Sequence, residues 1–252
     1  MQEKKVTLRY RVIKWFVRTF YKKYKVFGLE NLPDEPCIIV GNHCQLHGPL
    51  ACELYFPADK YIWCAGQMMH LREVPAYAYA DFWGQKPKRS RWYYKICSYL
   101  MAPLCVCIFS NAHTIPVYHD IRLLTTFKES MRLLSEGANL IVYPEHDKKH
   151  NEILYDFQRN FIDVAKSYYR REQKELVFVP MYIAPRLNAI YLGKPTRYSA
   201  ESGIEIERDR ITDYLMTEIT EMARALPEHT VIPYRNIRKK LYPKNTDRKD
   251  YR

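Results

Sequence analysis

The sequence lacks the features that would assign it to several large classes of protein. Its 252 residues contain no stretch of 18 or more that is free of both charge and proline, so no membrane-spanning helix is expected. Residues 1–5 lack the apolar core and small-residue cleavage site of a secretory signal peptide. No internal repeat or low-complexity tract is present. The length fits a single ordinary α/β domain with a large core.

The cysteines form no zinc or redox motif. All seven lie between Cys37 and Cys107, mostly inside apolar runs, and no pair has C-x-x-C spacing. We interpret them as small buried hydrophobic residues in a reducing cytoplasm. His43 and His47 are one helical turn apart, but no H-E-x-x-H accompanies them, and Gly48-Pro49 favours a helix that starts after both. No metal site is therefore expected.

Acidic residues are too few to balance the basic ones, and the excess of positive charge lies at the two ends. The formal net charge is +12; residues 1–30 carry +7 and residues 235–252 carry +6, which leaves −1 between them. Basic ends on a nearly neutral body indicate an anionic partner, either a membrane surface or a nucleic acid. No RNP-like, zinc-finger or helix-turn-helix signature is present, so nucleic acid is the less expected of the two.

Residues 6–25 have the periodicity of an amphipathic basic helix. Its apolar arc consists of Ile13, Phe16, Val17, Phe20 and Tyr24, with basic residues roughly opposite. Such a helix can lie in the headgroup plane of anionic lipid, or it can pack on its own domain with a solvated basic face. A second aromatic and apolar run, residues 92–109, follows a basic flank. It predicts either a segment that enters the interfacial layer without crossing it or a buried core helix.

Apolar runs with strand character alternate with segments of helical periodicity along the rest of the chain. Strands are predicted over residues 37–40, 61–64, 114–118, 139–143, 176–183 and 190–192, helices from Gly48-Pro49 to about 55 and over 121–135, 157–169 and 207–226, and a loop over 81–90. This alternation predicts an α/β fold with a mostly parallel sheet flanked by helices. We expect three parts: an amphipathic basic helix (1–27), an α/β domain (28–234) and a basic C-terminal tail (235–252).

Two polar turns directly follow two of the predicted strands. Asn42-His43 comes after the strand at 37–40, and Glu145-His146-Asp147 follows the strand at 139–143. Ligands of open α/β sheets bind outside the carboxyl ends of the strands, so the two turns can face one crevice. A histidine just ahead of a helix N-terminus stays neutral, which suits a general base at pH 7. The alternative is a turn-capping histidine with no chemistry.

The order of these motifs resembles the glycerolipid (lysophosphatidic acid type) acyltransferases. The likeness covers about residues 25–200, in the family's order and spacing. The segments that carry it are the lead-in Gly28-Leu29-Glu30-Asn31-Leu32-Pro33, the pair Asn42-His43 with Gly48 at the position of the family's aspartate, Ile115-Pro116-Val117-Tyr118-His119, Tyr143-Pro144-Glu145-His146, and Phe178-Val179-Pro180-Met181.

This resemblance implies transfer of a fatty acyl group from a thioester donor, acyl-CoA or acyl carrier protein, to a hydroxyl of a lysophospholipid or glycerolipid-like acceptor. His43 would be the general base, no cofactor would be bound, and the N–H groups that open the helix near Gly48 would stabilise the oxyanion. The protein would lie on the cytoplasmic face of the membrane. The implied site comprises His43 and His47 as catalytic residues and Asn42, His119, Arg122, Glu145, His146 and Pro180 as substrate-binding residues.

The chain departs from the family pattern at three positions. Gly48 replaces the aspartate that orients the histidine, which leaves His47 or Asp147 as substitute partners. His119 replaces an arginine, with Arg122 as a substitute phosphate ligand. His146 replaces a glycine beside Glu145. These departures predict an acceptor other than glycerol phosphate, or reduced activity. The first alternative is therefore a catalytically impaired lipid-binding relative of the same fold, and the second is a basic nucleic-acid-binding protein.

Overall fold

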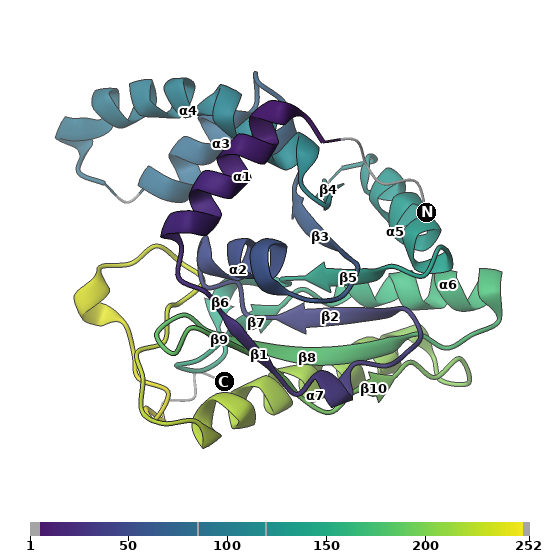
Figure 1. Ribbon diagram of the computed structural model, residues 1–252. Coiled ribbons are helices and arrows are strands. Elements are labelled where there is room, and N and C mark those ends of the chain that lie inside the picture. The colour runs from purple at the N-terminus through teal and green to yellow at the C-terminus, as the bar shows by residue number, and fades with distance from the viewer. Residues whose placement is uncertain (1–5, 85, 119, 249–252) are drawn as a thin grey trace. The chain divides into compact units, whose positions relative to one another are not determined.

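The computed structural model describes residues 6–84, 86–118 and 120–248, which belong to two compact units (Figure 1). The first unit comprises Met1–Lys22 and Tyr61–Glu129, and the second comprises Lys23–Lys60 and Ser130–Arg252. Each unit is thus assembled from separated stretches of sequence. The boundaries predicted at 27/28 and 234/235 do not coincide with these units and stay predictions.

The second unit is built on a sheet with the strand order β1-β9-β8-β2-β5. β2 pairs in parallel with both β5 and β8, β1 pairs in parallel with β9, and β8 is antiparallel to β9 and β10. The predicted α/β class with a mostly parallel sheet flanked by helices is therefore confirmed. The strands are β1 (Lys25–Phe27), β2 (Cys37–Gly41), β5 (Asn139–Val142), β8 (Val177–Ala184), β9 (Ala189–Leu192) and β10 (Thr196–Arg197).

The two central strands, β2 and β8, are buried along their whole length. Strands that are covered on both faces read as continuous apolar runs, which is what both sequences show. α2 (His47–Tyr55) covers one face, where Cys52 Sγ lies 3.7 Å from Met181 Sδ. α7 (Ile204–Ala225) lies on the opposite face, as Figure 1 shows, with α6 (Asp163–Glu172) beside it. The chain leaves β2 at Gly41 and enters α2 at His47, so the turn between them lies at the carboxyl end of β2.

The first unit contains the remaining helices and one parallel strand pair, β3 with β4. Its buried core consists of Met68, Val74, Ala78, Ala102 and Cys105. The elements are α1 (Leu8–Phe20), β3 (Lys60–Ala65), α3 (Val74–Ala78), a π-helical turn (Tyr79–Trp83), α4 (Arg91–Asn111), β4 (Thr114–Val117) and α5 (Leu123–Ser135). Two of them cross the boundary between the units: the first residue of β3 and the last residues of α5 belong to the second unit.

One helix of the first unit bears on the expectation that no segment spans a membrane. Lys88–Asn111 is long and apolar enough to do so by length and composition, and only 17% of its most apolar window is buried. Lys95 and Pro103 interrupt the run in sequence but do not end the helix, because α4 continues through both positions. By composition alone this helix could enter a membrane or pack against another surface.

The N-terminal helix is shorter than predicted. α1 ends at Phe20, so Tyr24 does not extend its apolar arc. Tyr24 is instead buried in the second unit, where its ring stacks on Tyr55 with centroids 6.1 Å apart. Lys25, next in sequence, already pairs with Ala189 in the sheet. Burial of Tyr24 and strand pairing therefore end the helical pattern five residues early.

The helix predicted over residues 157–169 also starts too early. Residues 145–157 form a hairpin instead, in which β6 (Glu145–Lys149) pairs with β7 (Tyr155–Phe157). A 3₁₀ turn (Arg159–Ile162) follows, and α6 begins only at Asp163. The charged sequence of β6 has no apolar alternation, so periodicity could not reveal the hairpin. Likewise, the predicted loop at 81–90 contains part of the π-helical turn and a 3₁₀ turn (Lys88–Ser90).

Candidate active site

The turn that follows β2 is fixed to β8 by the side chain of Asn42. Asn42 Oδ1 accepts the Ile183 N–H at 2.7 Å, and Nδ2 donates to the Ile183 carbonyl at 3.1 Å and to Cys44 Sγ at 2.8 Å. The amide thus continues the β2–β8 ladder one residue beyond the strand. Since Asn42 is buried and both of its amide hydrogens are donated inside the protein, this geometry indicates a structural role for its side chain.

The next two residues carry the chain through a strained turn. Cys44 and Gln45 have φ angles of 48° and 56°, a left-handed conformation that costs roughly 1–2 kcal/mol per residue. Burial raises the pKa of the Cys44 thiol well above its ordinary value, so Cys44 is not a nucleophile at neutral pH. Gln45 Nε2 donates to the Arg235 carbonyl at 3.2 Å and to the Tyr242 hydroxyl at 2.9 Å. The turn is therefore tied to a segment almost 200 residues later.

α2 begins at His47, and not after Gly48-Pro49 as expected. The His47 and Gly48 N–H groups donate to the carbonyls of Cys44 and His43, each at 3.1 Å, and Pro49 has no N–H. The backbone donors expected for an oxyanion at this helix start are therefore engaged inside the turn. A Cβ on Gly48 would lie only 2.4 Å from the His43 carbonyl oxygen. This turn cannot hold the family's aspartate without moving its backbone.

Glu145 joins the His43 turn to the β6–β7 hairpin. Its Oε2 accepts the backbone N–H of His43 at 2.6 Å, and its Oε1 accepts that of Tyr155 at 2.9 Å. Burial raises the pKa of this carboxyl to about 7, while the two N–H bonds act in the opposite direction. The structure thus brings together the two residues on which the sequence argument depended. Their contact runs through the backbone of His43 and not through its ring.

The His43 imidazole lies between two tyrosine rings and is half-buried. Its centroid is 5.3 Å from that of Tyr143 and 5.8 Å from that of Tyr234, both in T-shaped contacts. Burial lowers the pKa of His43 to about 4, with the Gln45 backbone opposing the shift, so the ring is neutral at pH 7 as expected. Nδ1 is buried and has no hydrogen-bond partner among the residues that the structure describes.

The two proposed substitutes for the missing aspartate do not reach that nitrogen. Asp147 forms an ion pair with Arg235 at 2.6 Å. His47 lies at the start of α2, half-buried, and its pKa is lowered by burial and by the positive charges of Arg186 and Lys239. No carboxylate bonds to the ring of His43 within the described ranges.

The segment that follows α7 contributes residues that sequence reasoning missed. The chain from 226 to 248 folds back on the second unit through Asn245, whose side chain bonds the N–H of His229 and the carbonyl of Ala223 at 2.8 Å each. This closing segment (residues 226–248) places Tyr234 on His43. The apolar run Val231-Ile232-Pro233-Tyr234, ahead of the charges, was the available signal.

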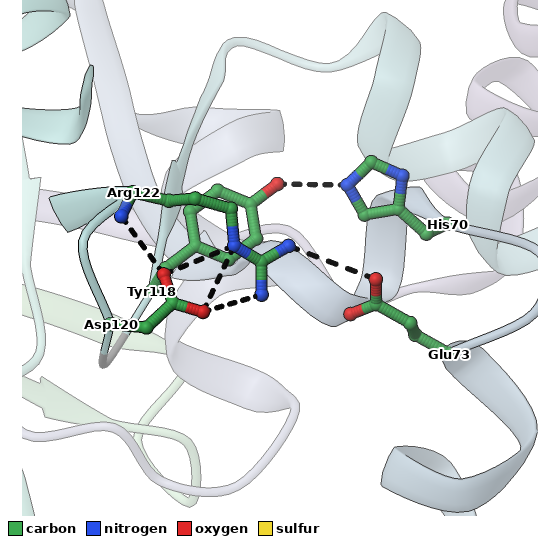
Figure 2. Close-up of polar contacts among 5 residues, drawn as sticks. All are labelled: His70, Glu73, Tyr118, Asp120 and Arg122. Carbon is green, nitrogen blue, oxygen red and sulfur yellow. Dashed lines mark hydrogen bonds and ion pairs between the residues drawn. The ribbon is translucent and has the colours of Figure 1, made fainter.

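Arg122, the substitute phosphate ligand, lies in a cluster of the first unit (Figure 2). Its guanidinium stacks 3.9 Å from the centroid of the Tyr118 ring, donates to both Asp120 oxygens and lies 3.7 Å from Glu73 Oε1. His70 Nε2 and the Tyr118 hydroxyl are 2.9 Å apart. Two carboxylates thus already occupy this arginine, so a phosphate would have to compete with them.

The remaining predicted substrate residues are dispersed. His146 is half-buried in β6, and Pro180 is buried in β8, where it pairs with Val40. His119 lies outside the described residues. The substrate-binding roles of His119, Arg122, His146 and Pro180 stay predictions, as does the catalytic role of His47. Among the described residues no group of His, Cys, Asp and Glu could hold a metal ion.

Comparison with known proteins finds a similarity of fold alone. No protein-family model and no curated protein matches the sequence. Among solved structures, the chain is similar to the 1-acyl-sn-glycerophosphate (LPA) acyltransferase PlsC from Thermotoga maritima. The TM-score is 0.51 and the identity 16%, over 88% of this chain and 80% of that one. The chain therefore has an acyltransferase-like fold.

Replacing Glu145 by glutamine tests its task in the turn. An amide has only one acceptor oxygen, so the N–H of either His43 or Tyr155 loses its partner, and we expect a loss of about 1–3 kcal/mol in the free energy of unfolding measured with urea. Because the folded pKa of about 7 lies above the ordinary 4.5, the wild type loses stability as pH rises from 4.5 through 7, and E145Q should lack this component. The exposed Glu201→Gln is the matched control; equal stability of E145Q and wild type would contradict this role.

An aspartate at position 48 should destabilise the protein. In Gly48→Asp the new Cβ would meet the His43 carbonyl oxygen at 2.4 Å, closer than real Cβ contacts allow. We expect a loss of roughly 1–3 kcal/mol in the free energy of unfolding, as for overpacked sites. Gly203→Ala, where the nearest atom is 3.9 Å from the Cβ position, is the control and should change little. A G48D protein as stable as the wild type would show that the turn is less rigid than its contacts indicate.

Proposed function

We propose that this protein is an acyltransferase that moves a fatty acyl group from a thioester donor, acyl-CoA or acyl carrier protein, to a hydroxyl of a lysophospholipid or glycerolipid-like acceptor. One observation carries the proposal. A neutral histidine lies in the turn after β2 and its backbone N–H is bonded to Glu145 at 2.6 Å, in a fold similar to that of an acyltransferase. The sequence likeness of the motifs supports the same reaction class.

The chemistry follows from the position of the imidazole. Because Nδ1 is enclosed, Nε2 is the nitrogen left to take a proton from the acceptor hydroxyl. The hydroxyl oxygen then attacks the thioester carbonyl, the carbon–sulfur bond breaks, and the leaving thiolate takes the proton from the imidazolium. The raised pKa of Cys44 favours this direct transfer over an acyl-cysteine intermediate.

Basic side chains near the turn support an anionic substrate. The charges of Arg186, in the turn between β8 and β9, and of Lys239, in the closing segment, both act on His47. Both side chains are exposed, and no carboxylate lies within ion-pair distance of either among the described residues. A phosphate of the donor or of the acceptor is the group that such cations would bind. Glu145 would act as the support of His43 in place of its implied task at the acceptor.

Replacing His43 by alanine should abolish turnover. We expect kcat to fall by roughly 10²–10⁴, the contribution of a general base, in an assay of thiol release from acyl-CoA with lysophosphatidic acid. In the wild type, kcat/KM should be constant at neutral pH and fall as pH drops through about 4, because protonation removes the base. The fold of H43A is checked by its near-UV spectrum. Full turnover by H43A would refute the mechanism.

A second candidate function follows from the unpartnered Nδ1. A base of the acyltransferase type is normally held by a carboxylate, and disrupting the equivalent pair in serine proteases costs about 10⁴ in rate. A lipid-binding relative with impaired catalysis would have this histidine without its partner. If no donor is consumed by the wild type, while lysophosphatidic acid binds equally to wild type and H43A, the second candidate replaces the first.

We further propose that the first unit binds the cytoplasmic face of the membrane peripherally. Its two longest helices expose apolar and aromatic side chains beside basic ones. On α1 these are Leu8, Val12, Trp15, Phe16 and Phe20, and on α4 they are Trp92, Tyr93, Ile96, Tyr99, Leu100 and Leu104, all at least 47% exposed. Exposed residues of this kind with flanking lysine and arginine are typical of an interfacial surface.

Co-sedimentation with vesicles tests this surface. The wild type should bind phosphatidylglycerol-containing vesicles more tightly than phosphatidylcholine vesicles and lose affinity with salt. The double variant Leu100→Glu/Leu104→Glu should bind roughly tenfold or more weakly, since two exposed apolar groups are lost. Leu241→Glu, an exposed leucine of the second unit, is the control. Tight RNA binding in a gel shift without vesicle binding would favour the nucleic-acid alternative.

A further inference from the structure

The two rings that enclose His43 come from distant parts of the second unit. Tyr143 directly follows β5, and Tyr234 belongs to the closing segment after α7. Their interplanar angles to the imidazole are 75° and 89°, so both contacts are close to perpendicular. Perpendicular pairs place the positive edge of one ring on the negative face of the other, and this preference restrains rotation of the imidazole.

Tyr234 is itself held by contacts that do not involve His43. Its ring lies 5.7 Å from that of Tyr155, the residue whose N–H is bonded to Glu145. The next residue, Arg235, forms an ion pair with Asp147 and accepts a hydrogen bond from Gln45 through its carbonyl. The position of Tyr234 is therefore fixed by the hairpin and by the turn that carries His43.

Among the described residues no carboxylate bonds Nδ1 of this imidazole, and Glu145 reaches only the backbone N–H of His43. A side chain at position 48 would collide with the His43 carbonyl, and Asp147 is engaged by Arg235. We propose that Tyr234, together with Tyr143, is the positioning residue of His43: the two rings set the orientation of the imidazole that a carboxylate sets elsewhere. This inference rests on the proposed function, because the orientation matters only if His43 acts as a base.

The rings also keep water from the imidazole, which gives the inference a readout that is separate from activity. Removing one ring hydrates His43, so its pKa should rise from about 4 toward the ordinary 6.5. The other titratable or charged groups around the turn include Cys44 and His47 on its own segment, Cys52 on α2, Glu145 and Asp147 on β6, Tyr155 on β7, Tyr182 on β8, Arg186 after β8, and Arg235, Lys239 and Tyr242 on the closing segment. A substitution at Tyr234 replaces none of these groups, although Tyr234 acts on the pKa of Arg235 and its ring contacts that of Tyr155.

The experiment compares Tyr234→Leu, which removes the ring, with Tyr234→Phe, which keeps it. We expect Y234L to lower kcat by roughly tenfold or more with little change in KM, because a misplaced base slows the chemical step and not binding. The acid limb of its pH profile should move up by a pH unit or more. Y234F should behave like the wild type. Tyr214→Leu, whose hydroxyl bonds the Lys194 carbonyl away from the turn, is the control.

A titration of the His43 ring by NMR, assigned by comparison with H43A, separates this inference from the proposed function. If the wild type has no acyltransferase activity but the pKa of His43 rises in Y234L, the proposed function fails and the ring enclosure stands. Unchanged kcat and unchanged titration in Y234L would overturn the inference. So would a loss in Y234F equal to that in Y234L, since the hydroxyl would then be the important group. If Y234L does not fold, Tyr143→Leu tests the other ring, and we expect the same fall in kcat and the same rise in the pKa of His43.

Discussion

The carboxylate of Glu145 is the constraint on which the rest of this site depends. It lies 102 residues from His43 in sequence and 2.6 Å from its backbone nitrogen, and its second oxygen accepts the N–H of Tyr155 in β7. A buried carboxylate is costly unless it is hydrogen-bonded, and here two backbone donors serve it. The His43 turn and the β6–β7 hairpin therefore hold each other in place. The Asn42 side chain makes a further connection, because it bonds the turn to the backbone of Ile183 in β8.

The class of fold was predictable from the sequence because the central strands are simple apolar runs. β2 and β8 are buried on both faces, and their sequences can form little else. The position of the site was predictable for the same reason: polar turns at the carboxyl ends of adjacent parallel strands must lie close together. The pairing of β2 with β5 and β8 then placed residues 42–45, 145 and 183 at one edge.

The contacts of each side chain were not predictable. Nothing in the sequence shows that Glu145 would bond to the His43 backbone, because that depends on a hairpin with no periodic pattern. The left-handed angles of Cys44 and Gln45 were equally hidden, since neither residue is a glycine. The contacts of the closing segment were not predicted, because Tyr234 directly precedes a run of charges and Asn245 lies within it, and no periodic pattern marks either residue. The sequence places Arg122 just after the segment 115–119, but its two carboxylate partners come from tertiary and local contacts.

The distance along the chain between the parts of this site has a consequence for how it is assembled. Gln45 and Tyr242, which share a hydrogen bond, are separated by 197 residues. Loop closure over such a separation is entropically unfavourable until the intervening sheet has formed, so we expect these contacts to form after the sheet. During synthesis the segment with His43 emerges long before the segment that encloses it. A nascent chain that stops before Tyr234 would therefore lack one of the two rings that lie against His43.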